Sequence, residues 1–309
     1  MWFKLAGVLP VVAMLAASST HQAATAQAWQ CKAPAKLSRP TIETPSPGEI
    51  RRTPIAGYVL ALSWSREFCR GRENDPAMEL QCSGKIGDFG FVLHGLWPEA
   101  AGPDYPQYCR KAAQLSRKVV ADNICMTPSV QLLQHEWTKH GTCMARKPET
   151  YFGAAKLLFE AIEFPDMDRL SRQGSKEGET PLNVGGLAEA FATANDGLPA
   201  NAIKVKTNRR GWLEEVKICL DKKFKPRACP SFVKGARDKA EVKVWRGGLS
   251  ASLGDCPKRS AVNCPRQVAL WISGACYAAL HGSCAWDSPQ NPPTRQSPAC
   301  PGDVYPDAF

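Results

Sequence analysis

Histidine is scarce in this chain: its 309 residues include only five, at positions 21, 94, 135, 140 and 281. The 13 cysteines form no CxxC pair, which weakens any case for a zinc site of that type. After the first 28 residues, no segment approaches the roughly 18 unbroken apolar residues of a membrane-spanning helix. Convincing internal repeats are absent as well. The mature chain is therefore expected to lie free of the membrane.

Residues 1–28 have the features of a secretory signal peptide. A basic Lys4 precedes an apolar stretch from Leu5 to Ala17, and Ala26-Gln27-Ala28 is a small-x-small cleavage site. The apolar stretch is too short to span a membrane. Export would place the many cysteines in an oxidising compartment, where disulfides form. We therefore expect a secreted or periplasmic protein.

The segment HEWTKHGTC, residues 135–143, concentrates ionisable groups. It follows a plausible helix start, with Thr127 as the cap and Pro128 in the first turn, so a helix is expected over residues 128–140. Four ionisable side chains on one patch are costly unless a charged ligand binds there. Helical periodicity of about 100° per residue places four of them within an arc of roughly 140°: His135, Glu136, Lys139 and His140.

A zinc protease is the obvious competing interpretation of this segment. Its motif, His-Glu-x-x-His, needs two histidines four residues apart so that both imidazoles reach one metal. Here the residue four positions after His135 is Lys139, whose ammonium repels a cation, and His140 follows one residue later. A purely structural role is the ordinary interpretation of a single helical histidine. Two histidines beside a carboxylate and an ammonium favour binding of an anion whose protons are moved.

A second motif, DFGFVLHGLWPE at residues 88–99, supplies a partner histidine. Its apolar part, Phe89–Leu93, predicts a short strand that ends at His94, with a turn at Gly95. Two imidazoles on separate elements can act as general base and general acid without a metal. With Lys139 as a fixed cation, the expected chemistry is in-line attack at a phosphodiester. The 2′-hydroxyl of RNA would supply the nucleophile.

The segments HGLWP at 94–98 and HEWTKHGTC at 135–143 resemble the two active-site segments of the ribonuclease T2 family. The resemblance covers roughly residues 56–244 and does not extend to the last sixty or so residues. It implies a secreted endoribonuclease of low base specificity that needs neither a metal nor another cofactor. Such enzymes cleave single-stranded RNA through 2′,3′-cyclic phosphates to 3′-phosphate ends.

The resemblance also implies a role for each residue of the two segments. His140 resembles the general base that takes the 2′-hydroxyl proton, and His94 resembles the general acid that protonates the 5′-oxygen leaving group. His135 matches the histidine that holds the substrate phosphate. Glu136 and Lys139 match the pair that stabilises the transition state. Ordinary histidine pKa values of about 6.5 predict a bell-shaped pH optimum on the acid side of neutral.

Three residues near the first motif are candidates for base binding. Trp97 matches an aromatic residue of the family's nucleobase pocket, and stacking on it would contribute roughly 1–3 kcal/mol per base. Tyr105 lies at about the right separation for a second stacking ring, and Glu99 stands where many members have aspartate. The ordinary alternatives are a core role for Trp97 and a loop role for Tyr105.

Cysteine pairing can be predicted only in part. The resemblance implies a disulfide between Cys109 and Cys143, which would tie the helix of the second motif to the loop after the first. The connectivity of residues 256–300 cannot be deduced, and the odd count leaves one thiol free or intermolecular. Cys31 and Cys125 have the least certain partners. Proximity along the chain suggests two further pairs, Cys69–Cys82 and Cys219–Cys229.

The expected organisation is one catalytic domain with appendages. A Pro-rich N-terminal arm at 29–55 follows the leader, and a Cys/Pro-rich extension at 246–309 follows a catalytic domain at 56–245. The mixture of strands and grouped helices predicts an α+β fold, with an antiparallel sheet packed with several helices and stapled by disulfides. Strands are expected at 58–64, 89–93, 203–206 and 213–220, and helices at 112–123, 128–140, 151–163, 184–194 and 268–280.

A net charge of +10 suits a polyanionic partner. We expect the extension to be a packing elaboration of the core rather than a separate binding module, because a stapled piece of its size has little core of its own. A solvated face is the ordinary interpretation of any single basic residue. The basic residues that could extend an RNA track are Lys204, Lys206, Arg209, Arg210 and the run from Lys217 to Lys225.

Two hypotheses from different functional classes remain at this point. The favoured one is an active endoribonuclease, and its rival is a catalytically idle, secreted RNA- or surface-binding protein of the same fold. The presence of both proton-transfer groups, His94 and His140, favours the enzyme, because a binding protein would need neither. The partner expected is RNA, bound by a monomer that needs no protein partner.

Overall fold

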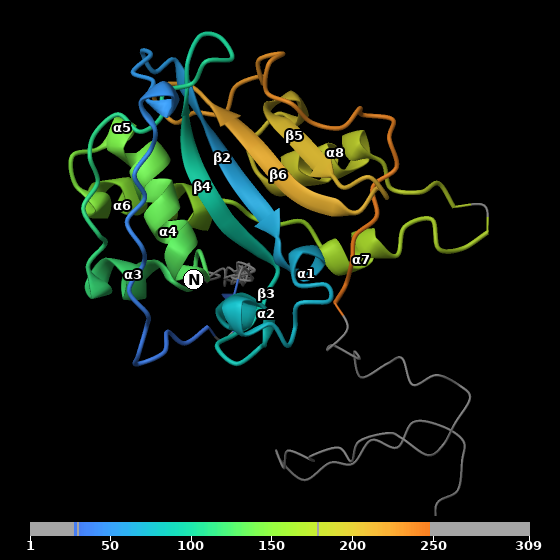
Figure 1. Cartoon of the computed structure of the whole chain (residues 1–309). Coiled ribbons are helices and arrows are strands. Elements are labelled where there is room, and N and C mark those ends of the chain that lie inside the picture. Colours follow the sequence, from blue (N-terminus) through green and yellow to red (C-terminus); the bar gives the residue numbers. More distant parts are fainter. Residues whose placement is uncertain (1–27, 30, 178, 248–309) are drawn as a thin grey trace, which may run out of the picture. The chain divides into compact units, whose positions relative to one another are not determined.

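The structure is a computed structural model that describes residues 28–29, 31–177 and 179–247 (Figure 1). All of the expected leader except Ala28, the predicted helix at 268–280 and nearly all of the C-terminal extension lie outside these residues. None of the described helices is long and apolar enough to cross a membrane.

An antiparallel four-stranded sheet with the order β4-β2-β6-β5 organises the described part of the chain (Figure 1). β2 lies between β4 and β6, and β5 pairs with the other side of β6. A two-stranded ladder of β1 and β3 is separate from this sheet. The expected α+β fold is confirmed. The strands are β1 (Ala28–Trp29), β2 (Gly57–Trp64), β3 (Asp88–Phe89), β4 (Phe91–Glu99), β5 (Ile203–Thr207) and β6 (Leu213–Leu220).

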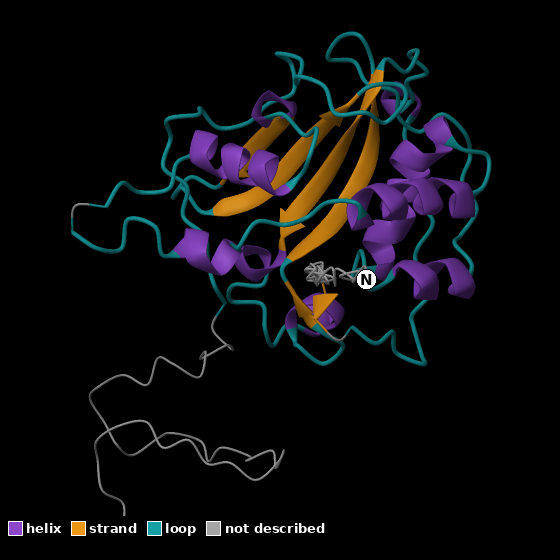
Figure 2. Cartoon of the chain, turned by 180° about the vertical axis from the view of Figure 1, so that it is seen from behind, coloured by secondary structure: helices purple, strands orange, loops and turns teal. Residues whose placement is uncertain are grey.

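Helices complete the fold. The long helices α6 and α8 contact the sheet, and Figure 2 shows the face of the sheet that helices cross. The opposite face of β2, β4 and β6 is visible along much of its length in Figure 1. The helices are α1 (Ser65–Phe68), α2 (Glu79–Cys82), α3 (Arg117–Asn123), α4 (Val130–Glu136), α5 (Thr142–Met144), α6 (Pro148–Glu160), α7 (Met167–Ser171) and α8 (Val184–Ala194), with 3₁₀ turns η1 (Pro47–Glu49), η2 (Pro76–Met78) and η4 (Ala200–Ala202) and a π-helical turn η3 (Trp137–Gly141).

Alternation along the strands divides the sheet into two faces with different chemistry. Leu60 and Leu62 of β2 join the main core together with Val216 and Ile218 of β6. The residues between them point to the opposite face, which we call the open face. This face carries the small or polar side chains Ala61, Ser63, Glu215 and Lys217.

The helix of the second motif begins later than the sequence predicts. Its cap is Ser129, whose hydroxyl accepts a hydrogen bond from the Leu132 amide at 3.2 Å. The predicted cap, Thr127, instead donates its hydroxyl to the carbonyl of Leu93 on β4 at 2.7 Å. The prediction of Thr127 as the cap was therefore wrong, because that side chain is used to hold the edge of the sheet.

The predicted strand at 89–93 also differs from the structure. The chain does not turn at Gly95 but continues as β4 to Glu99. Ala61 of β2 faces Gly95 and Leu62 faces Leu93, so His94 is an extra residue in a β-bulge. The glycine that suggested a turn lies within the strand.

Other predicted bounds differ by a few residues. The helix expected at 112–123 begins only at Arg117, because Ser116 caps it through the Val119 amide. The helix expected at 151–163 is α6, which begins at Pro148, and α7 was not predicted. The strand at 213–220 and the helix at 184–194 have the expected bounds.

Four disulfides staple the described residues. They include the three expected pairs, Cys69–Cys82, Cys109–Cys143 and Cys219–Cys229. The fourth joins Cys31 to Cys125, over a sequence separation of 94 residues. It anchors the start of the N-terminal arm to the segment that precedes α4.

Loss of the Cys31–Cys125 bridge is expected to destabilise the protein more than loss of Cys69–Cys82. The bridges close loops with sequence separations of 94 and 13 residues, and a longer loop restricts the unfolded chain more. The chain-entropy relation gives a difference of about 2 kcal/mol between the double serine variants. Urea unfolding of both variants measures it. An equal or larger loss of stability in the Cys69/Cys82 variant would show that effects on the native state, and not the entropy of the unfolded chain, determine what each disulfide contributes.

Candidate active site

The bulge in β4 places His94 at the centre of the candidate site. Its ring reaches across the neighbouring strand β2, whose open-face residues here are the small Ala61 and Ser63. On the far side, His94 Nδ1 lies 2.7 Å from Oε2 of Glu215 on β6. The ionised carboxylate can only accept, so Nδ1 donates and Nε2 is left as the nitrogen that can exchange a proton with a ligand.

The pKa values of this pair move in opposite directions. Burial opposes the protonation of His94, but the hydrogen bond to Glu215 and the charges of Glu136 and Glu215 outweigh it and raise the pKa of His94. Burial would raise the pKa of Glu215, yet the hydrogen bond and charge of His94, helped by Lys217 and Lys206, lower it. The pair therefore favours a protonated imidazole beside an ionised carboxylate.

Glu136, the last residue of α4, is buried directly against β4. Its Oε2 accepts a 2.8 Å hydrogen bond from the indole nitrogen of Trp97, and its Oε1 lies 3.8 Å from His94 Nε2. Gly95 makes this approach possible, because a Cβ there would lie 1.9 Å from Glu136 Oε2. Burial raises the pKa of Glu136 to about 7, although His94, Trp97 and Lys139 act to lower it.

His140 lies within η3, and only 4% of it is exposed. Its ring contacts those of Trp97 and Tyr105, with centroid distances of 5.6 and 5.9 Å. Burial lowers its pKa well below the ordinary histidine value, and the charges of Lys139, His135 and His94 add to the effect. Among the described residues, its buried Nδ1 has no hydrogen-bond partner. His140 is thus held neutral, as a proton acceptor must be.

The π-helical turn distributes the four ionisable residues of the second motif over two sides. Glu136 and His140 are buried toward β4, whereas His135 and Lys139 are half-buried beside them. π-Helical turns in α-helices are frequent at functional sites. His135 does not contact the other histidines: its Nδ1 lies 2.8 Å from Oε2 of Glu43, in the N-terminal arm. The four side chains therefore do not share one patch: His135 pairs instead with an acidic residue, Glu43, that the sequence did not indicate.

A cleft of about 300 Å³ opens beside His140. It contains all three residues predicted to bind a base, Trp97, Glu99 and Tyr105, and Lys139 also lines it. Trp97 is not simply a core residue, because it is half-exposed to this cleft while its indole nitrogen holds Glu136. The other lining residues are Val59, Pro103, Lys217, Phe232, Val233, Lys234 and His140.

Glu99 is the unusual acid of this cleft. Only 9% of it is exposed, and burial raises its pKa to about 7 against the lowering effects of Lys217 and Arg227. A carboxyl group with such a pKa changes between hydrogen-bond donor and pure acceptor near neutral pH. The Lys217 ammonium also lies 5.6 Å from the Trp97 ring centroid. The cleft thus offers aromatic surface, a cation and a titratable carboxyl to a ligand.

A second hollow, of about 530 Å³, lies on the other side of the site and includes His94. Four basic residues line it, Arg70, Arg72, Lys206 and Arg210, together with three acidic ones, Glu67, Glu214 and Glu215. Two of the basic residues, Lys206 and Arg210, belong to the predicted RNA track, whereas Lys204 and Arg209 do not line this hollow. His140 therefore lines an aromatic cleft, and His94 lines a hollow of mixed charge.

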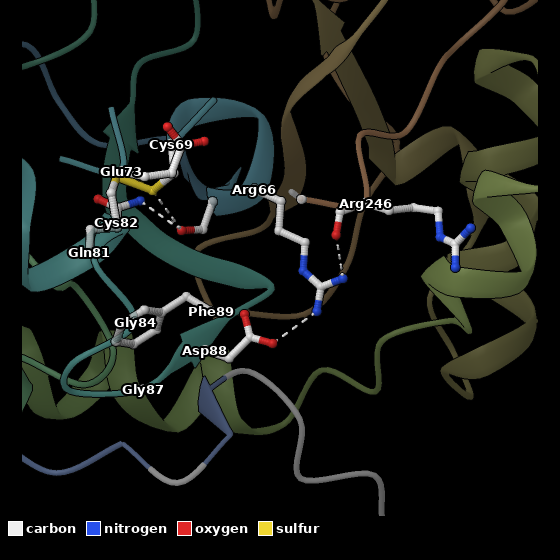
Figure 3. A pocket seen from close by; sticks show the side chains of 12 residues that line it. Arg66, Cys69, Glu73, Gln81, Cys82, Gly84, Gly87, Asp88, Phe89 and Arg246 are labelled. Carbon is white, nitrogen blue, oxygen red and sulfur yellow. Dashed lines mark hydrogen bonds and ion pairs between the residues drawn. A yellow bond between two sulfur atoms is a disulfide. The ribbon is translucent and has the colours of Figure 1, made fainter. Parts of the chain in front are cut away.

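A third hollow, of about 280 Å³, lies beside the Cys69–Cys82 disulfide (Figure 3). Arg66 crosses it, donating to Asp88 at 3.2 Å and to the carbonyl of Arg246 at 2.9 Å. None of the predicted site residues lines this hollow. The two hydrogen bonds of Arg66 thus connect β3 with the segment that follows residue 245.

Sequence reasoning missed two acids of the site. In the sequence, Glu215 is one of two glutamates in an alternating strand, and nothing local distinguishes it. Its partner His94 lies 121 residues earlier in the chain. Glu43 lies in a segment whose composition suggests a linker. Within the described residues, no group of three or more His, Cys, Asp or Glu side chains is arranged so that it could hold a metal ion.

The sequence of this chain is similar to those of several known proteins. Residues 56–229 match the sequence model of the ribonuclease T2 family. A "Probable ribonuclease" of Haemophilus influenzae is 36% identical over 198 residues, which cover 60% of this chain and 64% of that protein. A "Ribonuclease" of Aeromonas hydrophila is 36% identical over 168 residues, which cover 53% of this chain and 71% of that protein.

Solved structures of other proteins are also similar. The structure of RNase NT in complex with 5′-AMP has a TM-score of 0.48 and 21% identity, over 62% of this chain and 98% of that one. The RNase-related protein from Calystegia sepium has a TM-score of 0.48 and 23% identity, over 61% and 97%. The match of the family model to more than half of the sequence decides the relationship. The chain belongs to the ribonuclease T2 family.

Proposed function

We propose that the protein is a secreted endoribonuclease that cleaves single-stranded RNA by metal-independent transphosphorylation. The observation that carries the proposal is the pair of histidines with opposite pKa shifts, His94 and His140, which flank Trp97. One imidazole is biased toward the protonated form and the other toward the neutral form. A general acid and a general base need this difference.

In the first step, His140 takes the proton of the 2′-hydroxyl as the 2′-oxygen attacks the adjacent phosphorus. The bond from phosphorus to the 5′-oxygen breaks, and His94 donates a proton to that oxygen. The products are a 2′,3′-cyclic phosphate and a free 5′-hydroxyl. In the second step the roles reverse: His94 takes a proton from water, which attacks phosphorus, and His140 returns a proton to the 2′-oxygen. A 3′-phosphate remains.

The neighbouring residues stabilise charge and hold the reacting groups in position. Lys139 lines the cleft beside His140, where its ammonium neutralises negative charge that grows on the phosphoryl oxygens. Glu136 stabilises the protonated His94 at 3.8 Å and holds Trp97 in place. His135 binds the phosphate. Glu215 keeps His94 in the tautomer that presents Nε2.

Residues 56–245 are proposed to form the catalytic domain, which acts outside the cytoplasm. Four disulfides among the described residues support an oxidising compartment, secreted or periplasmic. Trp97 and Tyr105 provide stacking surfaces that tolerate any base. The rival hypothesis of an idle RNA-binding protein is not favoured, because it leaves the two oppositely biased histidines without a purpose.

Digestion of yeast RNA in EDTA at mildly acidic pH tests the proposal. The wild-type protein is expected to keep its full rate, whereas His94→Ala and His140→Ala should each lose about 10²- to 10⁴-fold, the usual contribution of a general acid or base. Lys118→Ala is the matched surface control, since that lysine pairs only with Asp122 on α3.

Each other outcome of this digestion has a distinct meaning. Activity lost to EDTA would indicate a metal-dependent enzyme. A wild-type protein that is inactive in every buffer would favour the binding protein. Wild-type rates in both histidine variants would refute the assignment of His94 and His140.

Glu215→Gln is expected to move the alkaline limb of the pH profile of kcat/KM to lower pH. His94 acts as a general acid only while protonated, so activity falls as pH rises through its pKa, which Glu215 raises. Removing the carboxylate charge lowers the pKa of His94, so activity falls at a lower pH. Glu189→Gln, an exposed change of the same charge on α8, should leave the limb in place. An unmoved limb in Glu215→Gln would exclude this role.

Base preference is expected to depend on pH through Glu99. Above about pH 7 its carboxylate is charged and accepts hydrogen bonds from the N1 and N2 donors of guanine. The ratio of cleavage at guanosine to cleavage at adenosine should therefore rise between pH 6 and pH 8. In Glu99→Gln, which stays neutral, the ratio should be constant over this range. A wild-type ratio that does not change with pH would place Glu99 outside base recognition.

A further inference from the structure

The N-terminal arm lies along the helix that carries the second motif. In Figure 1 it runs as a dark blue trace in front of α4 and reaches the level of α5. Its start is fixed by the Cys31–Cys125 disulfide, and the carbonyl of the buried Pro40 accepts a 2.7 Å hydrogen bond from Gln114. Its length and composition predict a linker, but the arm is held in place along its whole course.

Two residues of the arm pair with two residues of α4. The backbone of Thr41 both donates to and accepts from the side chain of Gln131, at 2.8 and 3.1 Å. One turn further along the helix, Glu43 contacts His135. Alternate residues of an extended chain are spaced about as far apart as residues four apart on a helix, roughly 6–7 Å, so the two contacts are in register.

Both oxygens of Glu43 are engaged. Oε2 lies 2.8 Å from Nδ1 of His135, and Oε1 accepts from Gln131 Nε2 at 3.3 Å. The carboxylate is 27% exposed and the imidazole 32% exposed. The described residues supply no hydrogen bond to His135 Nε2. The glutamate is thus a fixed acceptor for one nitrogen, and the other stays available to a ligand.

Further along, the arm supports the base cleft. Arg51 exchanges two backbone hydrogen bonds with Gln107, at 3.0 and 2.9 Å. Its guanidinium carbon lies 4.8 Å from the Tyr105 ring centroid, and its Nε donates to the Tyr105 carbonyl at 3.0 Å. Thr53 donates to the carbonyl of Asp104 at 2.7 Å. The loop that carries Tyr105 is therefore built against the arm.

We infer that the arm completes the active site and that Glu43 is a positioning residue for His135. Glu43 accepts a hydrogen bond from Nδ1–H and so directs the Nε2–H of the protonated imidazole toward the phosphate of the RNA, as outer partners of functional histidines commonly do. This inference rests on the proposed function, which assigns binding of the substrate phosphate to His135. The arm lies outside residues 56–229, so the match to the family model does not include Glu43.

Kinetics with a dinucleoside phosphate, in variants of the full-length protein, test the inference. Glu43→Ala is expected to raise KM about tenfold, the effect of losing one hydrogen bond to a charged group, with kcat changed much less. Glu43→Gln keeps an acceptor for Nδ1–H and should recover part of the loss. Gln131→Ala removes the hydrogen bonds of Gln131 to the Thr41 backbone and to Oε1 of Glu43, and leaves the contact of Oε2 with His135. Glu160→Ala, an exposed acid on α6, controls for charge.

Binding of adenosine 3′-monophosphate, measured by calorimetry, provides a readout that does not depend on activity. Glu43→Ala should weaken it about as much as it raises KM, whereas Gln131→Ala and Glu160→Ala should not. If the wild-type protein binds the nucleotide but cleaves no RNA, the proposed function fails while the role of Glu43 in holding His135 can still be decided.

Two results would overturn the inference. A lower KM and tighter nucleotide binding in Glu43→Ala would show that the carboxylate repels or blocks the phosphate, as an autoinhibitory contact would. Equal losses of kcat, nucleotide binding and thermal stability in Glu43→Ala and Gln131→Ala would show that the arm only stabilises the fold.

Discussion

The contact between Glu136 and β4 is the constraint on which the site depends. A carboxylate with 2% exposure rests over Gly95 and is held by the indole of Trp97. Burying an ionisable group is costly, so this contact persists only because the strand offers a donor and a space without a side chain. It places the helix of the second motif against the first motif and thereby sets the distance between His94 and His140.

The same arrangement accounts for the electrostatics. His94 lies between two carboxylates, Glu136 and Glu215. His140 is instead buried against aromatic rings and is close to the positive charge of Lys139. One chemical group thus acquires two opposite proton affinities within a single site. The two acidic residues beside His94 come from α4 and β6. No carboxylate of the described residues makes a hydrogen bond with His140.

The sequence predicted the elements whose signal is local. The alternation of Leu213–Leu220 and the apolar periodicity of Val184–Ala194 gave the correct bounds, since each pattern is complete within its own segment. The two histidine motifs identified most of the candidate site for the same reason. The spacing of Cys69 and Cys82, and of Cys219 and Cys229, allowed pairing by proximity.

Features set by distant contacts could not be predicted. Gly95 suggests a turn, but its role follows from Glu136, which lies 41 positions later in the chain. Glu215 is recognisable only when β6 is placed two strands from β4. Glu43 lies in a segment rich in proline, threonine and serine, whose composition indicates a linker and conceals its contact with α4.

The extra residue in β4 changes which side chains of that strand reach the core. Before the bulge, Phe91 and Leu93 point inward, and after it Leu96 does so. Before His94 the odd-numbered residues of β4 point toward the core, and after it the even-numbered residues do. An uninterrupted strand would direct Trp97 and Glu99 into the apolar core together with Phe91 and Leu93. Length is therefore constrained here as well as chemistry: in a regular strand, residues three and five apart face opposite sides, so only the extra residue allows His94 to share the open face with Trp97 and Glu99.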